Sequence, residues 1–333
     1  FIAGVNAGNS IASGGNQNTV VGDEAGTAIT TGDENVFVGF QSGDALVDGT
    51  FNVAMGSNSL TTDTKGKKSV AIGTNALATQ NFTSLTDTFN TAVGHSAGTA
   101  VTTGIKNTFI GGLAGDATTD ADSNVAVGFG SLTTNVLGSK SVAVGQGSLS
   151  DQNPATAVDM FNVGVGFNVG ASVTTGTNNT LIGGLAGDAI TTGTSNNAVG
   201  YDALGATTTA NQNNAFGRNS LGSNTTGADN SAFGQNSLGA NTTASNNVAV
   251  GSDALAANTT GAGNTAVGTI ALDRCTTSSN NTAVGHEALT NMTGGGGNTA
   301  LGKSTMSAVV TGSNNTAVGY TALNANTTAS NNV

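Results

Sequence analysis

Short apolar segments alternate with longer polar ones along this chain, and a glycine marks the end of each apolar segment. These anchor glycines recur every 17 residues, apart from two steps of 21, from Gly73 to Gly94 and from Gly145 to Gly166. An apolar run of four or five residues between Asn and Gly is too short for a helix and predicts a β-strand. A strict short period is typical of one supersecondary unit stacked many times. The pattern therefore predicts an all-β protein, a parallel β-solenoid of about 19 rungs spaced about 4.8 Å apart.

The residue four before each anchor glycine is nearly always asparagine, with Ser69 and Ser141 as exceptions. In a parallel stack these side chains lie one above another, and each amide can donate to one rung and accept from another. We therefore expect a structural ladder of asparagines. The clearest members are Asn107, Asn124, Asn179, Asn264, Asn281 and Asn315. The anchor glycine is expected at positive φ or against a closely approaching backbone.

The two residues before each anchor glycine are both apolar, as at Phe109 and Ile110. Alternate strand residues point to opposite faces, so one of the two can fill the interior while the other needs a partner. Another copy of the same chain is the natural partner. We expect a homo-oligomer, with three chains around an axis favoured, and we expect a charge at either Phe109 or Ile110 to disrupt it.

A longer period of 72 residues, four rungs, is superimposed on residues 1–200, whereas residues 201–333 follow the simple 17-residue repeat. No linker interrupts the chain, which predicts one continuous solenoid over residues 1–333. The four extra residues of each 21-residue step lie in longer bends at 78–89 and 150–161. Insertions in solenoid bends often lie on the binding face, although a longer bend can equally pack its phenylalanine onto the fibre. The candidate attachment residues are Phe82, Asp87, Phe89, Pro154, Asp159 and Phe161.

Composition narrows the class of protein. With 51 glycines, no tryptophan and 4% aromatic residues, the chain can build a thin core repeated along an axis. A net charge of −11 with 8 basic residues argues against nucleic-acid binding. One cysteine, Cys275, leaves no intrachain disulfide or CxxC metal site. No segment is long and apolar enough for a membrane helix, and both ends fall within a repeat, so we expect a piece of a longer fibre.

The rung motif resembles a known one. Ser69-Val70-Ala71-Ile72-Gly73 and Ser141-Val142-Ala143-Val144-Gly145 resemble the head repeats of trimeric autotransporter adhesins (YadA-like). That resemblance implies a left-handed parallel β-roll in which three chains pack side by side and bind host surfaces or matrix. The segment from Asn315 to Leu323 is also similar to repeats of tailed-phage fibres and microbial surface fibre proteins. The rungs here are longer than those of the adhesin heads, which predicts a wider cross-section.

Residues of catalytic type are scattered. His95 and His286 both follow an anchor glycine, at a position that elsewhere holds Tyr201 or Tyr320, which is typical of a surface or interface column. The acid-rich bend at 116–124 matches no calcium-loop spacing and is expected to be a solvated bend. We therefore expect no enzymatic activity, no cofactor and no metal.

These patterns favour a structural extracellular fibre on a cell or virion surface that supplies reach and stiffness and mediates attachment. Its expected partners are its own copies and a surface glycan or protein receptor, with no nucleic acid and no membrane insertion. One alternative is a self-assembling extracellular filament without a receptor. Another is an ice-binding solenoid with stacked threonines, suggested by pairs such as 225–226 and 242–243, although only one threonine of each pair would face outward.

Overall fold

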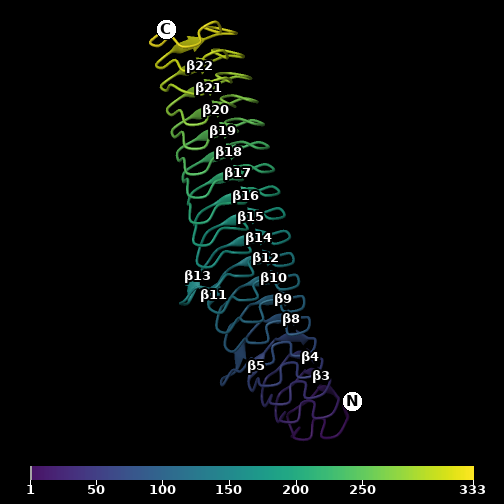
Figure 1. Ribbon diagram of the computed structural model, residues 1–333. Helices are drawn as coiled ribbons and strands as arrows, with labels where there is room; N and C mark the ends of the chain where they lie inside the picture. Colours follow the sequence, from purple (N-terminus) through teal and green to yellow (C-terminus); the bar gives the residue numbers. More distant parts are fainter. Residues whose placement is uncertain (1) are drawn as a thin grey trace. The chain divides into compact units, whose positions relative to one another are not determined.

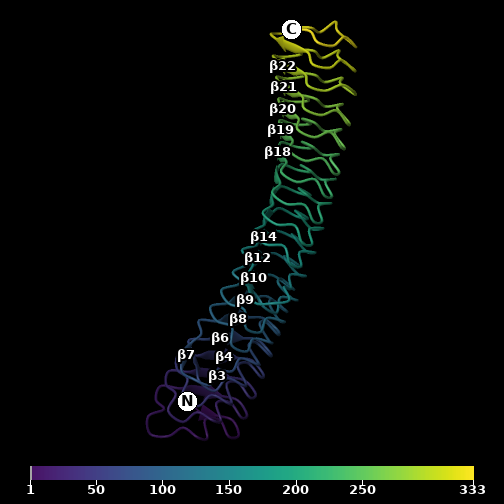
Figure 2. The same ribbon diagram turned by 90° about the vertical axis from the view of Figure 1, so that its left-hand side faces the viewer.

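A computed structural model of the protein describes residues 2–333, and these residues form strands, turns and bends without an α-helix. Contacts within the chain divide it into two compact units, Phe1–Phe167 and Asn168–Val333, which we describe separately. Figure 1 and Figure 2 show that in each unit the chain winds through turn after turn, with one short strand per turn lying above the last. We call each turn a rung and these strands the stacked strands.

The first unit contains parallel stacked strands in which paired residues are mostly 17 positions apart, as for Val125 and Val142, and 21 apart across the two longer bends, where Val70 pairs with Thr91 and Val142 with Val163. The offset is 18 between the first two strands, where Ile2 pairs with Val20. Two short pairs join each longer bend to the preceding rung: β5 (Gly66–Lys67) pairs with β7 (Thr86–Asp87), and β11 (Gly138–Ser139) pairs with β13 (Val158–Asp159). The stacked strands are β1 (Ile2–Ala3), β2 (Thr19–Val21), β3 (Val36–Val38), β4 (Val53–Met55), β6 (Val70–Ile72), β8 (Thr91–Val93), β9 (Thr108–Ile110), β10 (Val125–Val127), β12 (Val142–Val144) and β14 (Val163–Val165).

The second unit repeats the arrangement with parallel strands and a 17-residue offset throughout, as between Thr265 and Thr282. The expected parallel β-solenoid with a 17-residue repeat is thus confirmed in each unit. Its left-handed coil, and its continuity over residues 1–333, stay predictions. The stacked strands are β15 (Thr180–Ile182), β16 (Asn197–Val199), β17 (Asn214–Phe216), β18 (Ser231–Phe233), β19 (Val248–Val250), β20 (Thr265–Val267), β21 (Thr282–Val284), β22 (Thr299–Leu301) and β23 (Thr316–Val318).

The anchor glycines are required by both conformation and space. Gly111 has a φ of 131°, which L side chains rarely adopt. A Cβ at Gly111 would lie 2.6 Å from the carbonyl oxygen of Gly128 in the next rung. The other anchor glycines with a neighbour above them within their unit meet the same obstruction. Any other residue would push adjacent rungs apart at this corner.

The ladder asparagines hold each bend to the next strand. The backbone N–H of Asn107 donates to Oδ1 of Asn90, and Oδ1 of Asn107 accepts the N–H of Asn124, both at 2.9 Å. Nδ2 of Asn107 donates to the carbonyl of Ala121 at 2.8 Å. These amides are buried, so hydrogen bonds inside the chain must replace those with water. Within their units Asn124, Asn264, Asn281 and Asn315 likewise accept the backbone N–H of the residue 17 positions later, and Asn179 accepts that of Asn196.

The middle residue of each stacked strand points inward, and in many rungs its size is matched by the residue six positions later; β8 and β14 are exceptions, with Ala92 and Gly98 and with Gly164 and Gly170. Where the inward residue is Phe109, the matching residue is Gly115, and a Cβ there would lie 2.5 Å from the Phe109 ring. Where the inward residue is Ala126, the matching residue is the buried Leu132. Phe37 with Gly43 and Leu181 with Gly187 repeat the first combination. Two types of rung therefore fill the same narrow cross-section in complementary ways.

This complementarity predicts that a second substitution restores stability lost through a first. Phe109→Ala should destabilise the first unit by about 3–5 kcal/mol, because it leaves a cavity the size of a phenyl ring. Adding Gly115→Leu converts the rung into the Ala126–Leu132 type. It should restore more than half of the loss, since Leu132 already adopts a φ of 51° close to the 57° of Gly115. Denaturant unfolding of both variants tests this. A double variant no more stable than Phe109→Ala would contradict the pairing.

Candidate functional site

The candidate sites of this protein are surfaces. Along residues 2–333 no pocket is present, and no group of three or more His, Cys, Asp or Glu side chains is placed to hold a metal ion. Two surface features stand out from the repeating background. One is the outward side of the stacked strands, and the other is the pair of longer bends.

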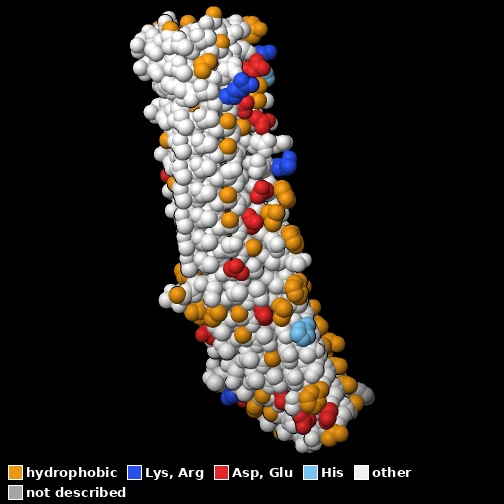
Figure 3. Space-filling view, viewed as in Figure 1, with side chains coloured by type: hydrophobic (Ala, Val, Ile, Leu, Met, Phe, Trp, Pro, Cys, Tyr) orange, Lys and Arg blue, Asp and Glu red, His pale blue; other side chains and the backbone are white. Residues whose placement is uncertain are grey.

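The outer strand face consists of the first and third residues of every stacked strand, which point away from the interior. Phe109, in the middle of β9, is fully buried, whereas the next residue, Ile110, is 39% exposed. The structure thereby separates two positions that the sequence left equivalent. Figure 3 shows hydrophobic side chains exposed on the surface. Exposed third-position residues are Met55, Ile72, Ile110 and Val165 in the first unit, and Ile182, Phe216, Phe233, Val250, Leu301 and Val318 in the second.

Strand propensity alone does not account for these apolar residues. Threonine is also β-branched and occupies the first strand position at Thr265, Thr282 and Thr299, so it could serve at the third position too. Instead the third position of β2–β4 and of the later stacked strands holds Val, Ile, Leu, Met or Phe. An exposed row of large apolar side chains repeated rung after rung is typical of an interaction surface.

Aromatic side chains widen this face by one column, because they follow several anchor glycines. The Phe129 ring covers Gly112 of the preceding rung, where an added Cβ would lie 3.5 Å from it. Tyr201 covers Gly184 in the same way at 3.7 Å. His95 and His286 occupy this exposed column, in line with the expectation of a surface position. Exposed aromatic members are Phe40, Phe129, Phe167, Tyr201 and Tyr320.

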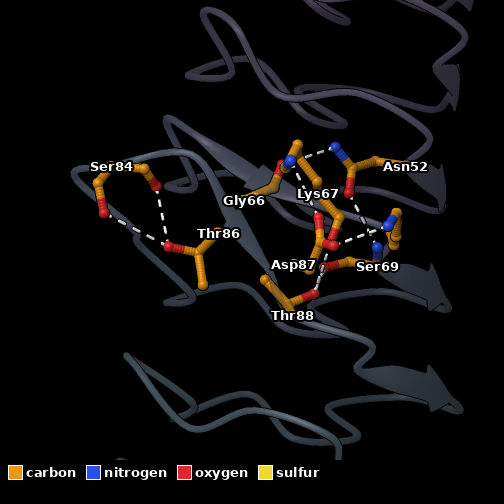
Figure 4. Close-up of polar contacts among 9 residues, drawn as sticks. Asn52, Gly66, Lys67, Ser69, Ser84, Thr86, Asp87 and Thr88 are labelled. Atoms are coloured by element: carbon orange, nitrogen blue, oxygen red, sulfur yellow. Dashed lines mark hydrogen bonds and ion pairs between the residues drawn. The ribbon is translucent and has the colours of Figure 1, made fainter.

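The first longer bend is held at its base by an ion-paired lysine. Nζ of Lys68 lies 2.7 Å from Asp87 and 5.0 Å from the centroid of the Phe89 ring. Lys68 and Lys67 hydrogen-bond the Asp87 carboxylate and so hold its pKa below the usual value. Figure 4 shows Asp87 beside Lys67, with Ser69 hydrogen-bonded to Thr88 and Asn52. The charged cluster therefore stabilises the bend.

The second longer bend repeats the same contacts 72 residues later. Nζ of Lys140 lies 2.6 Å from Asp159 and 5.3 Å from the centroid of the Phe161 ring. Phe161, like Phe89, remains 50% exposed. Four of the six candidate attachment residues therefore lie in two matched Asp–Phe clusters, each organised by a lysine.

Phe82 and Pro154 do not belong to the exposed part of the bends. Both side chains are buried, with Phe82 only 7% exposed, so the expectation that they are available for attachment is wrong. The exposed large apolar side chains of the tips are Leu85 and Val158, at 58% and 39%. The sequence pattern did not single out either residue.

Gln80 and Gln152 supply a side-chain amide to the ladder where serine replaces asparagine. Nε2 of Gln80 donates to Oγ of Ser69 at 2.9 Å, and Oε1 of Gln80 accepts Nδ2 of Asn90 at 2.8 Å. Gln152 accepts Ser141 Oγ at 3.1 Å in the second bend. The smaller serine makes room for the longer glutamine, whose amide takes over the missing hydrogen bonds. The 72-residue spacing shared by both Ser and both Gln was a usable sequence signal.

Asp63 is a buried carboxylate beneath the first longer bend. It accepts Nε2 of Gln80 at 2.6 Å and the backbone N–H of Gly66 and Phe82 at 3.0 and 3.1 Å. Burial raises the pKa of Asp63 above its usual value, although these hydrogen bonds oppose the change. The equivalent residue in the second bend is the neutral Asn135, whose Oδ1 accepts Nε2 of Gln152 at 3.2 Å.

Side chains of the acid-rich bend and of the threonine pairs form hydrogen bonds between rungs. Asp116 accepts Thr133 Oγ1 at 2.6 Å, and Asp120 accepts Thr103 Oγ1 at 2.8 Å. Thr225 is half-buried and donates to the carbonyl of Thr242 at 2.9 Å, whereas Thr226 is exposed. One threonine column therefore faces outward, so the exposed surface carries a single line of threonines. The ice-binding alternative has no other support here.

No protein-family model matches the sequence, and no curated protein matches it either. The similarity to adhesin head repeats therefore rests on the rung motif and stays a prediction. Residues 2–333 contain no helix that is long and apolar enough to cross a membrane.

The buried Asp63 predicts a pH-dependent stability. Its folded-state pKa lies above the unfolded value near 3.8, so between the two values the folded state binds more protons and stability falls as pH rises. Asp63→Asn should remove this pH-dependent loss of stability. Its melting temperature should match wild type near pH 3, exceed it increasingly as pH rises through the folded-state pKa of Asp63, and stay higher by a constant amount above that pKa.

Thermal unfolding from pH 3 to 8 measures the effect of Asp63→Asn. Asp87→Asn is the control of opposite sign, because the lysines lower the pKa of Asp87 and its carboxylate is stabilising at neutral pH. Equal melting temperatures of wild type and Asp63→Asn across the whole range would contradict the role assigned to burial.

Proposed function

We propose that this protein is a structural extracellular fibre segment, in which the repeated rungs supply length and the outer strand face joins further copies of the same chain. The observation that carries the proposal is the uncharged apolar column present in both units. No first or third residue of any stacked strand is Asp, Glu, Lys or Arg, although the chain has 27 such residues elsewhere, 19 acidic and 8 basic. Depletion of charge is the compositional mark of an interface core.

The size of the face supports self-association. In the second unit, nine strands spaced about 4.8 Å apart and three to five residues wide, at about 3.3 Å per residue, form a strip of roughly 40 by 10–16 Å. Two such strips in contact bury on the order of 1,000 Å², where specific interfaces begin. A partner built on the same rung spacing matches the strip over its whole length, and a second copy has that spacing.

We favour three chains around a common axis. The strip is narrow and lies on one side of each rung, so three strips can converge on an axis while the acidic bends point outward. This arrangement separates like charges on a chain of net charge −11. The motif resemblance to surface fibres supports a location on a cell or virion surface.

We further propose that the tips of the bends at 78–89 and 150–161 attach the fibre to a surface glycan or protein receptor. The bases of the two bends share the same lysine–aspartate–phenylalanine contacts, whereas the tips differ, with Thr-Ser-Leu-Thr at 83–86 and Ala-Thr-Ala-Val at 155–158. A fixed base that presents a variable, exposed tip is typical of a recognition loop.

A charge on the outer strand face should abolish assembly without unfolding the chain. Val250→Asp adds a carboxylate to a side chain that is 37% exposed in the single chain, so the rung can remain folded. In an interface the same carboxylate would be desolvated, which should weaken association at least 100-fold. Sedimentation velocity and circular dichroism measure both outcomes.

Thr260→Asp is the matched control, because it adds the same charge to an exposed bend position of the same rung, away from the outer strand face. It should sediment like wild type. A monomeric wild-type chain, or a Val250→Asp variant that assembles normally, would contradict the proposal. Ile110→Asp should behave like Val250→Asp, whereas Phe109→Asp should unfold its rungs, because Phe109 is buried.

The attachment role predicts a separate loss of binding. Leu85→Ser with Val158→Ser removes the exposed apolar tips and leaves the lysine-paired bases intact, so folding and assembly should not change. Binding to immobilised matrix proteins and glycans should fall at least tenfold. Unchanged binding by the folded variant would place recognition elsewhere, and no binding by wild type to any surface would favour the receptor-free filament.

A further inference from the structure

The outer strand face of the second unit contains one aromatic interruption. Its third-position column is aliphatic except at Phe216 in β17 and Phe233 in β18. The two rings are stacked, with centroids 5.0 Å apart and planes inclined by 6°. They are 37% and 41% exposed, so the stack is partly accessible on this face.

The surroundings of this pair are more polar than the rest of the face. The first strand positions beside the rings are Asn214 and Ser231, where the later strands β20–β23 have threonine. The residues after the two anchor glycines are Arg218 and Gln235, both exposed. Aromatic anchors surrounded by polar side chains are typical of energetic hot spots in protein interfaces. The polar column is itself ordered, since Asn197 donates to Asn214 at 2.8 Å.

A repeating face leaves the axial register between copies poorly specified. Sliding one copy by a single rung, about 4.8 Å, replaces each valine contact with another valine contact. The valines of this column, such as Val199, Val250 and Val267, therefore do not distinguish the aligned register from one that is slipped by a rung. Only a position that differs from its neighbours along the axis can distinguish them, and a slip would set an aromatic ring against an aliphatic side chain.

We propose that the Phe216–Phe233 stack sets the axial register between copies of this chain, which lie parallel, with each Phe216 against Phe216 of its neighbours. The inference rests on the proposed self-association and adds its geometry. Parallel copies around an axis place every residue at the height of its own counterpart. That arrangement aligns the aromatic pair, its polar surroundings and the aliphatic column together.

Disulfide trapping resolves one rung, because oxidation requires Cβ atoms within about 4.5 Å. The background is Cys275→Asn, which removes the buried native thiol and restores the asparagine found at Asn224, Asn241 and Asn258 in equivalent bends. Val199→Cys alone should give efficient cross-linked dimers in the assembled protein. Mixed Val199→Cys and Ile182→Cys chains, labelled with different tags, should give at least fivefold less mixed product.

The decisive variant is Phe216→Val with Phe233→Val, which makes the column aliphatic throughout. It should remain assembled by sedimentation, while the mixed Val199–Ile182 product rises to the level of the Val199–Val199 product. Val267→Ala with Val284→Ala is the matched control, since it trims two adjacent rungs of the same column and leaves the rings in place. This control should keep the native cross-linking pattern.

The possible failures are distinguishable. A monomeric wild-type chain refutes the self-association itself. An assembled chain whose cross-linking is unchanged by loss of both rings refutes the register role. Cross-linking of Val199→Cys to Val250→Cys in place of Val199→Cys to itself refutes the parallel orientation, because it indicates an antiparallel pair centred on the stack.

Discussion

The close approach of successive rungs at the anchor glycines is the constraint on which this structure depends. At Gly111 the space for a Cβ is already taken by the carbonyl of Gly128. Once the backbones lie this close, the parallel strand pairing follows, and equivalent side chains must stack in columns. Each column then accepts only residues whose chemistry tolerates a copy of itself about 4.8 Å away. Buried amides and small apolar groups meet that condition, whereas a buried column of like charges does not.

A thin cross-section makes hydrogen bonding as important as apolar burial. Many inward positions are alanine, so each rung buries little apolar volume. The ladder asparagines form hydrogen bonds with buried backbone groups that water cannot reach. The longer bends show that the requirement is for an amide at that place and not for asparagine as such. Where Ser69 shortens the ladder side chain, Gln80 reaches in from the bend to supply the amide.

Charge and apolar exposure are segregated around each rung. The acids and bases lie in turns and bends, where Lys68 and Lys140 pair with Asp87 and Asp159, and the stacked strands carry none. This segregation leaves the first and third positions of the stacked strands free of the charges that oppose association. The proposed functions follow from it: copies join along the uncharged side, and the charged bends with their exposed tips remain available to other molecules.

The sequence by itself determined the repeat length, the strands, the glycine corner and the asparagine ladder. In a solenoid, residues 17 apart in the chain are neighbours in space, so each column can be read directly from the repeat. The tertiary structure decided which residues face each other across the interior of a rung. Strand alternation separates Phe109 from Ile110 without saying which faces inward, and only the folded cross-section pairs Phe109 with Gly115. The burial of Phe82 and Pro154 likewise depends on the path of a bend that interrupts the repeat, because no neighbouring rung provides a template for it.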